Sequence, residues 1–480
     1  MQWHKLFAVV FTAFFLTACG GSLEGESTPT DPTDPTDPTD PVPTEPVEEV
    51  AGVPSYFTYT SSSQSFIAIQ GTGGAGRAEA SIVTFQLLDK NGAPVDSEDV
   101  TFTADLPSGG SINPLSGTTD SDGYVRTTVS SGKVSGLSKV KVTLDSNTSI
   151  SVQSDAISIS TGLPDQNSFT LGLSDFAPSA WNHNGETVDV TVILSDHFNN
   201  TVPDGTVVYF HTEGGKIQNT TSPVGYCETL QGTCSMQWIS SNPRPADGRI
   251  TITAWALGEE SFVDKDNDGW FSNGDIFTVV DTPIFNNQTD LPEVFFDYNN
   301  NGVYDAASDE EFIALETDTI VDDQIYTEAD GLFTGALCSD AEQTAGNCNQ
   351  SLVHVRMNAT LAMASDSVRC NIYANDVDLT NGNIDLTAVQ SIPLQFIVQD
   401  ENGNTPPTDT TISIETANGK IEGTTSFTKS SNSIEPWVKT LILANEDEAN
   451  GQTNGLLTVK IVTPKNGEEF VCQANVIDAG

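Results

Sequence analysis

Apolar and polar residues alternate along most of the chain from Val53 onward, in short runs of five to eight residues. Gly, Asn, Asp and Pro separate these runs, and no long segment has the periodicity of an amphipathic helix. Successive side chains of a strand point to opposite faces, so alternation lets one face be buried while the other stays in water. The pattern therefore predicts an all-β chain built of antiparallel β-sandwiches.

The same strand pattern occurs three times. Each copy has an alternating strand, a turn that begins with Asp, a second apolar strand, and then a Gly-Gly-x-Ile or Asn-Gly-x-Ile step. A further alternating strand follows each copy, at residues 139–144, 249–255 and 456–462. Internal repetition of this kind indicates tandem copies of one domain. The copies lie at residues 83–112, 188–217 and 394–421.

The Asp-x-x-Gly-x-Pro-Val turn at residues 89–95, the strand after it and the Gly-Gly-x-Ile step resemble the bacterial immunoglobulin-like (Ig-like) domains of the invasin and intimin group. The first copy also carries Thr-Asp-Ser-Asp-Gly at residues 119–123, which the other copies lack. The resemblance implies a seven-stranded antiparallel Greek-key sandwich for each copy. On this basis we expect Ig-like domains at residues 53–162, 163–365 and 366–480.

The second of these domains is expected to carry an insertion. Residues 234–264 resemble exported Ig-like proteins in which acidic loops interrupt a domain just before its last strand. The resemblance implies an insertion at about residues 259–350, after which residues 352–362 return as the closing strand.

The first residues are typical of an export signal. A weakly basic start precedes an apolar run of eleven residues, Leu6–Leu16, which is too short to span a bilayer. The run leads into Leu-Thr-Ala-Cys-Gly at residues 16–20, which resembles the lipobox of bacterial lipoproteins. This resemblance implies a signal peptide at residues 1–18, cleavage before Cys19 and acylation of Cys19 that anchors the chain in a membrane. A buried N-terminal helix with an incidental Cys is the alternative.

The segment after Cys19 predicts a disordered linker at residues 19–52. It contains four consecutive Thr-Asp-Pro repeats at residues 30–41, and residues 22–49 include no aromatic residue. Such a segment buries too little apolar surface to fold, and its Pro residues and charges favour an extended chain. The linker is either a stalk or a passive spacer. Gly20 after Cys19, in place of an Asp, favours the outer membrane as the destination.

The net charge of the chain limits the classes of molecule that it can bind. The chain has 18 Lys and Arg residues against 66 Asp and Glu residues, a formal net charge of −48. No basic patch for nucleic acid or anionic lipid can be assembled from this composition. The excess of carboxylates favours solubility and cation binding instead.

Six cysteines remain beyond Cys19, and an even number in an exported chain predicts disulfides. Local spacing favours Cys227–Cys234 and Cys338–Cys348, which leaves Cys370–Cys472 to close the C-terminal domain, although the sequence does not fix the pairing. A zinc site is the alternative, but no Cys-x-x-Cys occurs and the five His residues are scattered.

Residues 264–275 match the Ca²⁺-binding loop of EF-hands in the spacing of their oxygen ligands, with Gly269 at the sharp bend. No flanking helices are evident, so we expect the loop without the EF-hand. The predicted ligands are Asp264, Asp266, Asp268, the Trp270 carbonyl and Asp275.

A second loop at residues 297–308 keeps this spacing except at its twelfth position, which is Ser308. Its last carboxylate must come from residues 309–311, so we expect a weaker or irregular site. Ordinary Asp- and Asn-rich surface turns are the alternative for both loops. The predicted ligands are Asp297, Asn299, Asn301, Val303, Asp305 and Glu310.

No motif predicts catalysis: the chain lacks Gly-x-Ser-x-Gly, His-Glu-x-x-His and a phosphate-binding Gly-rich loop. We therefore expect a non-catalytic, surface-tethered rod of Ig-like domains, structural or adhesive, stiffened by Ca²⁺ and disulfides, that contacts a protein or a glycan. A periplasm-facing outer-membrane lipoprotein that scaffolds an envelope complex is the main alternative, and a carbohydrate-active enzyme or lectin is a more distant one. The single histidines are interpreted as surface or packing residues: His183, His197, His211 and His354.

Overall fold

The computed structural model describes residues 52–478 except 75, 220–223, 278–288, 300, 309, 315–324, 447–451 and 466. Cys19, the apolar run before it and the Thr-Asp-Pro linker lie outside the described residues. The export, lipidation and linker hypotheses therefore stay predictions. Within the described residues, no helix is both long and apolar enough to cross a bilayer.

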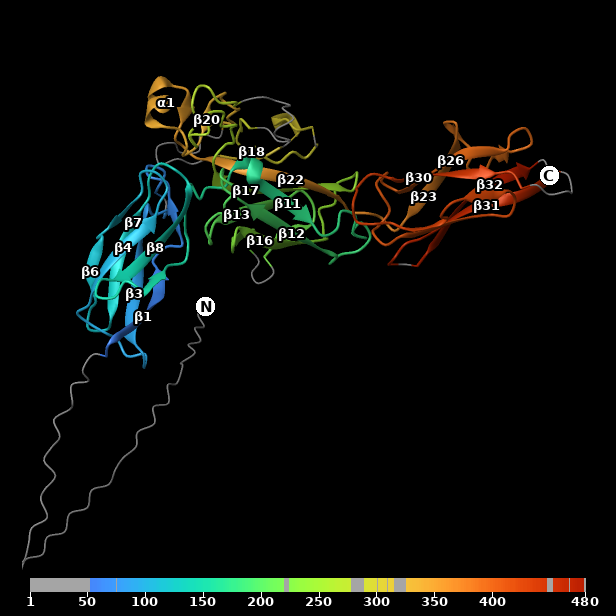
Figure 1. The fold of residues 1–480 in the computed structure, drawn as a ribbon. Helices are drawn as coiled ribbons and strands as arrows, with labels where there is room; N and C mark the ends of the chain where they lie inside the picture. The colour runs from blue at the N-terminus through green and yellow to red at the C-terminus, as the bar shows by residue number, and fades with distance from the viewer. Residues whose placement is uncertain are drawn as a thin grey trace, which may run out of the picture. The chain divides into compact units, whose positions relative to one another are not determined.

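Residues 54–160 form sandwich 1, in which two sheets enclose one hydrophobic core (blue to cyan in Figure 1). Alternation along the strands produces this core, because Phe85 and Leu87 of one sheet and Phe102 of the other are almost completely buried. The first sheet has the order β1 (Pro54–Ser62), β3 (Ala80–Asp89), β7 (Tyr124–Ser130), β5 (Ser111–Asn113). The second has the order β2 (Phe66–Ala68), β10 (Ile157–Ser160), β8 (Gly136–Leu144), β4 (Asp99–Asp105), β6 (Ser116–Thr118), with β9 (Ser151–Gln153) paired to β8.

Sandwich 2 begins after the 3₁₀ turn η1 (Gln166–Ser168) and packs two four-stranded sheets. Trp238 is fully buried at its centre and donates its indole N–H to the Gly214 carbonyl at 2.8 Å. One sheet has the order β11 (Phe169–Leu173), β12 (Thr187–Leu194), β16 (Thr233–Ile239), β14 (Lys216–Gln218). The other has the order β15 (Tyr226–Glu228), β13 (Val207–Thr212), β17 (Arg249–Gly258), β22 (Val353–Ala362).

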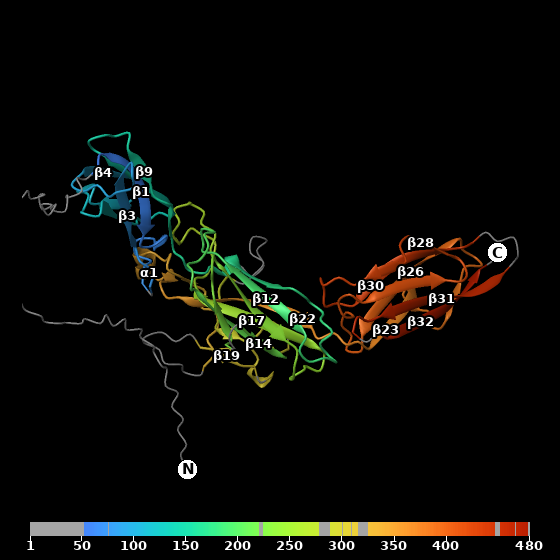
Figure 2. The ribbon, with the colours of Figure 1, turned by 90° about the horizontal axis from the view of Figure 1, so that it is seen from below.

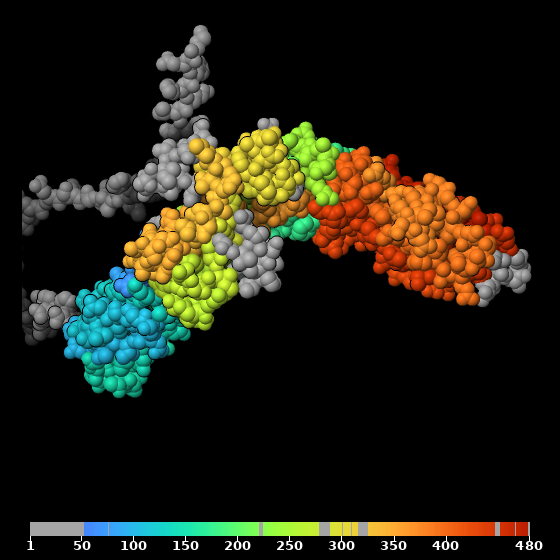
Figure 3. All heavy atoms as spheres, turned by 90° about the horizontal axis from the view of Figure 1, so that it is seen from above, coloured from blue at the N-terminus to red at the C-terminus, as the bar shows by residue number. Residues whose placement is uncertain are grey.

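The insertion lies between β17 and β22. These strands pair without interruption from Arg249↔Ala362 to Gly258↔Val353, so the chain leaves and re-enters the sheet at the same end. The insertion has little regular structure: its residues, yellow to light orange in Figure 3, lie at the surface beside the green residues of sandwich 2. Its elements are β18 (Val294–Phe295), η2 (Ala306–Ser308), β19 (Phe312–Ile313), β20 (Phe333–Thr334), α1 (Asp340–Ala345) and β21 (Cys348–Asn349).

Residues 368–478 form sandwich 3 (orange to red in Figures 1 and 2). Its core contains Leu394, Phe396 and Val398 of β26, which alternate with more exposed residues. One sheet has the order β24 (Val377–Asp378), β23 (Val368–Ala374), β26 (Ser391–Asp400), β30 (Trp437–Ala444), β28 (Lys420–Glu422). The other has the order β25 (Asn383–Asp385), β32 (Glu469–Asp478), β31 (Thr453–Val462), β27 (Thr411–Thr416), β29 (Ser426–Thr428).

The all-β prediction is confirmed, but two details differ from the seven-stranded antiparallel pattern that the resemblance implies. The described residues place eight strands in sandwich 2 and ten in each of the other two, because short strands of two or three residues extend the sheet edges. In addition, β2 pairs with β10 and β25 with β32 in parallel. Both pairs join segments far apart in the sequence, which alternation alone does not reveal.

Candidate metal centre

Two consecutive buried carboxylates fix the base of the insertion, directly after β17. Glu260 accepts backbone hydrogen bonds from Leu291 and Thr334, each at 2.7 Å. Glu259 accepts from the Thr161 hydroxyl at 2.8 Å and from the Ala336 N–H at 3.1 Å. Desolvation by burial raises the pKa of Glu259 to about 7 and that of Glu260 to about 8. The pattern of the sequence gave no signal for these two residues beyond their position at the end of a strand.

An aromatic cluster positions the first acidic loop beyond this base. The Phe262 ring lies 5.5 Å from that of Phe271 and 5.0 Å from that of Phe333, both edge to face, and it stacks on His197 at 4.4 Å. Phe271 also donates its N–H to the Leu337 carbonyl at 3.0 Å. The loop therefore starts and ends on a packed support and has a defined place on the surface.

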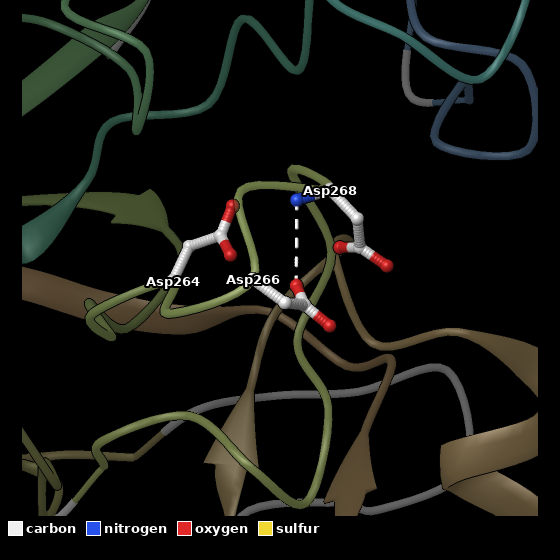
Figure 4. Close-up of side chains that lie close together, drawn as sticks. All are labelled: Asp264, Asp266 and Asp268. Atoms are coloured by element: carbon white, nitrogen blue, oxygen red, sulfur yellow. Dashed lines mark hydrogen bonds between the residues drawn. The ribbon is translucent and has the colours of Figure 1, made fainter.

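The first loop, residues 264–275, folds around its own carboxylates. Asp264 accepts from the Asn267 N–H at 2.6 Å and from the Gly269 N–H at 2.8 Å, and Gly269 has φ +80°, a left-handed conformation that Gly adopts readily. Ligand oxygens of Asp264, Asp266 and Asp268 come within 4.8 Å of one another (Figure 4). Desolvation and the charges of Asp268 and other neighbouring carboxylates raise the pKa of Asp266. Three hard oxygen donors at this separation suit Ca²⁺.

Two further predicted ligands of this loop have contacts that the sequence did not indicate. Asp275 accepts from the Lys265 N–H at 2.9 Å and from the Ser272 N–H at 2.7 Å, so in this structure its carboxylate closes the loop. The indole of Trp270 donates to the Lys133 carbonyl of sandwich 1 at 2.9 Å, and the Lys133 ammonium lies 5.8 Å from its ring centre. The loop thus contacts the preceding sandwich through a residue that we expected to offer only its carbonyl.

The second loop, residues 297–310, has the same kind of turn. Asp297 accepts from the Asn301 N–H at 3.0 Å and the Gly302 N–H at 2.7 Å, and Asn301 accepts from the Val303 N–H at 2.8 Å. Asn299 accepts from the Asn301 N–H at 3.0 Å. Among the described residues of this loop, however, no three acidic ligand atoms approach one another as those of the first loop do.

Glu310 completes the second loop. One of its carboxylate oxygens accepts from the Asp305 N–H at 2.8 Å. The side chain is 5% exposed, and its other oxygen is buried without a hydrogen-bond partner among the described residues. A buried carboxylate oxygen with no donor is costly, and a cation bound there would neutralise it. Of the described candidates for the last ligand, Glu310 therefore fits better than Glu311, which lies beyond it.

Aromatic packing holds the second loop against sandwich 2. Phe296, which precedes Asp297, stacks on His211 of β13 at 3.6 Å and lies 5.9 Å from the Trp255 ring of β17. Burial lowers the pKa of His211. Two more of the described histidines contact carboxylates: His183 bonds Asp366 at 2.5 Å, and His197 contacts Asp165 at 3.3 Å. Burial lowers the pKa of His354 to about 4.

Three disulfides join the six cysteines beyond Cys19: the two pairs that local spacing favours and the pair that these leave over. Cys227–Cys234 links β15 to β16 across the two sheets of sandwich 2, and Cys338–Cys348 closes the end of the insertion. Cys370–Cys472 links β23 to β32 and so connects the two sheets of sandwich 3. In sandwiches 2 and 3, the two sheets are therefore held together by a covalent bond as well as by their hydrophobic core.

These features define a tandem Ig-like β-sandwich protein with an acidic insertion in its second sandwich. A scan against protein-family models found no match, and a search of curated proteins found none either.

Solved structures to which the chain is similar include bacterial adhesins. The FdeC adhesin of Escherichia coli is 14% identical, with 90% of this chain and 100% of that chain covered and a TM-score of 0.28. InvD of Yersinia pseudotuberculosis is 12% identical, with 88% and 97% covered and a TM-score of 0.28. The D0–D1 domains of intimin are 17% identical, with 42% and 90% covered and a TM-score of 0.20. At these scores, the fold assignment rests on the strand pairing described above.

Proposed function

We propose that this chain is a non-catalytic, surface-tethered Ig-like lipoprotein that acts as a structural or adhesive rod. In this proposal, lipid on Cys19 anchors it to the outer membrane, and its sandwiches contact a protein or a glycan. Ca²⁺ in the two acidic loops and the three disulfides stiffen the sandwiches. The net charge of −48 makes nucleic acid an unsuitable partner.

The observation that carries the stiffening role is the placement of the first loop. Its three clustered carboxylates lie within 4.8 Å of one another in a loop whose Trp270 contacts Lys133 of sandwich 1. The three carboxylates repel one another, which favours opening of the loop. A bound divalent cation would attract all three and so hold the loop closed. Ca²⁺ would therefore order both the loop and its contact with the preceding sandwich. The Glu310 oxygen that has no hydrogen-bond partner among the described residues supports a second, structurally separate site.

Thermal unfolding of the full chain in Ca²⁺ and in a chelator tests this proposal. Ligand binding to the folded state stabilises it by about 2.7 kcal/mol when the free ligand is 100 times its Kd. For a unit of 150–250 residues, this corresponds to a rise in Tm of roughly 5–10 °C. We expect such a rise with Ca²⁺, and a much smaller one with Mg²⁺, which demands a stricter octahedral geometry.

Variants assign the effect to the loops. D266N/D268N removes two charges from the first loop, so we expect it to lose part of the Ca²⁺-dependent rise in Tm; E310Q should lose another part. D122N is the matched control, because Asp122 is an exposed acid in a Gly-containing turn without a third carboxylate close by. Equal Tm values in Ca²⁺ and chelator for the unmodified chain would remove calcium from the proposal.

A further inference from the structure

In each sandwich, a buried Asp at or just after the end of a central strand forms a turn with the same hydrogen bonds. In all three, one carboxylate oxygen accepts the N–H groups of the second and fourth residues that follow, at 2.8–3.0 Å. Each Asp also donates its own N–H to the carbonyl of that fourth residue. The turn therefore needs only one of the two carboxylate oxygens. The three residues are Asp89, Asp196 and Asp400.

In sandwiches 2 and 3, the other oxygen accepts a hydrogen bond from the end of the preceding sandwich. For Asp196 the donor is the hydroxyl of Ser160, the last residue of β10, and for Asp400 it is the N–H of Ser365, three residues after β22 ends, at 3.0 Å. The sequence separations are almost equal, 36 and 35 residues. All four residues are completely buried.

Among the described residues, the first turn shows no such second contact. The positions 36 and 35 residues before Asp89 are Val53 and Pro54, which have no side-chain donor, and Pro has no N–H. The second carboxylate oxygen of Asp89 faces Gly52, where an added Cβ would lie only 2.1 Å from it. Asp89 thus has the turn without the contact to a preceding sandwich.

The hydrogen bonds that Asp196 and Asp400 accept from the preceding sandwich are strong ones. Each joins a carboxylate to a donor away from water, where a charge-assisted hydrogen bond is strengthened and an unpaired charge is costly. Desolvation by burial raises the pKa of both carboxyl groups, and the hydrogen bonds from the turn and from the preceding sandwich oppose that rise. Further bonds surround each contact: Asn200 donates to the Ser160 hydroxyl at 3.1 Å, and Ser365 donates its hydroxyl to Glu401 at 2.6 Å.

We propose that Asp196 and Asp400 are joint residues, each of which shapes the turn of its own sandwich through one carboxylate oxygen and holds the end of the preceding sandwich through the other. The joints restrict the movement of neighbouring sandwiches and need neither Ca²⁺ nor the lipid anchor. The joint hypothesis goes beyond the proposed function, because it identifies which residues couple the sandwiches.

Amide hydrogen exchange of the full chain, in chelator so that calcium plays no part, tests both joints. S160A removes the first donor and leaves the turn intact. S158A is its control, since Ser158 lies in the same strand and its buried hydroxyl has no partner among the described residues. We expect S160A to speed exchange of the Asp165 N–H, which bonds the Ser195 carbonyl across the joint, by about tenfold. S158A should leave it unchanged.

For the second joint, D400N retains one oxygen for the turn but places an amide N–H against the N–H of Ser365. D89N makes the same change where no such donor is present. We expect D400N to speed exchange at Ser365 and at Glu401, whose N–H bonds the Ser367 carbonyl, also by about tenfold. D89N should affect no more than its own turn. If S160A behaves like S158A, and D400N leaves exchange at Ser365 unchanged just as D89N changes only its own turn, the joint proposal is wrong.

Discussion

Glu259 shows how a single buried carboxyl group couples the stability of this protein to pH. It is fully buried and bonded to Thr161 and Ala336, and desolvation raises its pKa to about 7 in the folded chain from an ordinary value of 4.5. When folding raises the pKa of a carboxyl group, the contribution of that group to stability is fully present at pH values below its pKa in the unfolded chain. The contribution is lost as the pH rises through its pKa in the folded chain.

We expect the folded chain to be less stable at pH 9 than at pH 5, and E259Q to reduce this difference. Gln keeps an acceptor for the Ala336 N–H and can donate to the Thr161 hydroxyl, but it does not ionise. The part of the pH dependence that it removes is on the order of 3 kcal/mol. We expect Glu260, whose pKa is about 8, to cause the pH dependence of stability that remains in E259Q. Urea unfolding at both pH values measures the effect, and identical pH profiles for the two proteins would contradict it.

At the scale of elements, the Gly-Gly-x-Ile and Asn-Gly-x-Ile steps form the same tight approach of two strands in sandwiches 2 and 3. Gly215 and Gly419 both have φ +71°. An added Cβ would lie 2.8 Å from the Ile239 carbonyl oxygen at Gly215 and 3.0 Å from that of Ala444 at Gly419. In each case, the residue after the Gly pairs with the residue that carries this carbonyl. The repeated Gly is therefore required by both conformation and space.

G215A should consequently destabilise sandwich 2 by more than the cost of placing Ala in a left-handed conformation. Its Cβ would also lie 2.7 Å from the indole nitrogen of the buried Trp238. G205A is the control, because Gly205 has φ +85° with no atom within 4 Å of an added Cβ. We expect about 1–2 kcal/mol for G205A from the left-handed conformation, and about 1–3 kcal/mol more for G215A from the clash. Equal losses of unfolding free energy would refute this interpretation.

At the scale of the whole molecule, the sequence predicted those features that depend on neighbouring residues. Alternation indicates the strands, and repeated turn residues indicate three copies. The first acidic loop could be predicted because its clustered carboxylates, Asp264, Asp266 and Asp268, lie within five consecutive residues.

Features that depend on distant segments could not be predicted in this way. Ser160 and Asp196 are 36 residues apart, and Trp270 contacts Lys133 across 137 residues. The burial of Glu259 results from the linker before sandwich 2 and the returning end of the insertion, which alternation does not bring together. The sequence also gave no sign that one Glu310 oxygen is buried without a hydrogen-bond partner among the described residues.

In the proposed function, the sandwiches stand on the outside of the cell, held by lipid on Cys19. Protease treatment of intact cells that carry the chain with a C-terminal epitope tag tests it most directly, with a periplasmic protein as the integrity control. We expect that the tag is removed while the periplasmic protein survives, and that C19S no longer fractionates with the membrane. A chain that stays intact on whole cells, and is cleaved only after the outer membrane is permeabilised, would rule out surface exposure and favour a periplasm-facing scaffold.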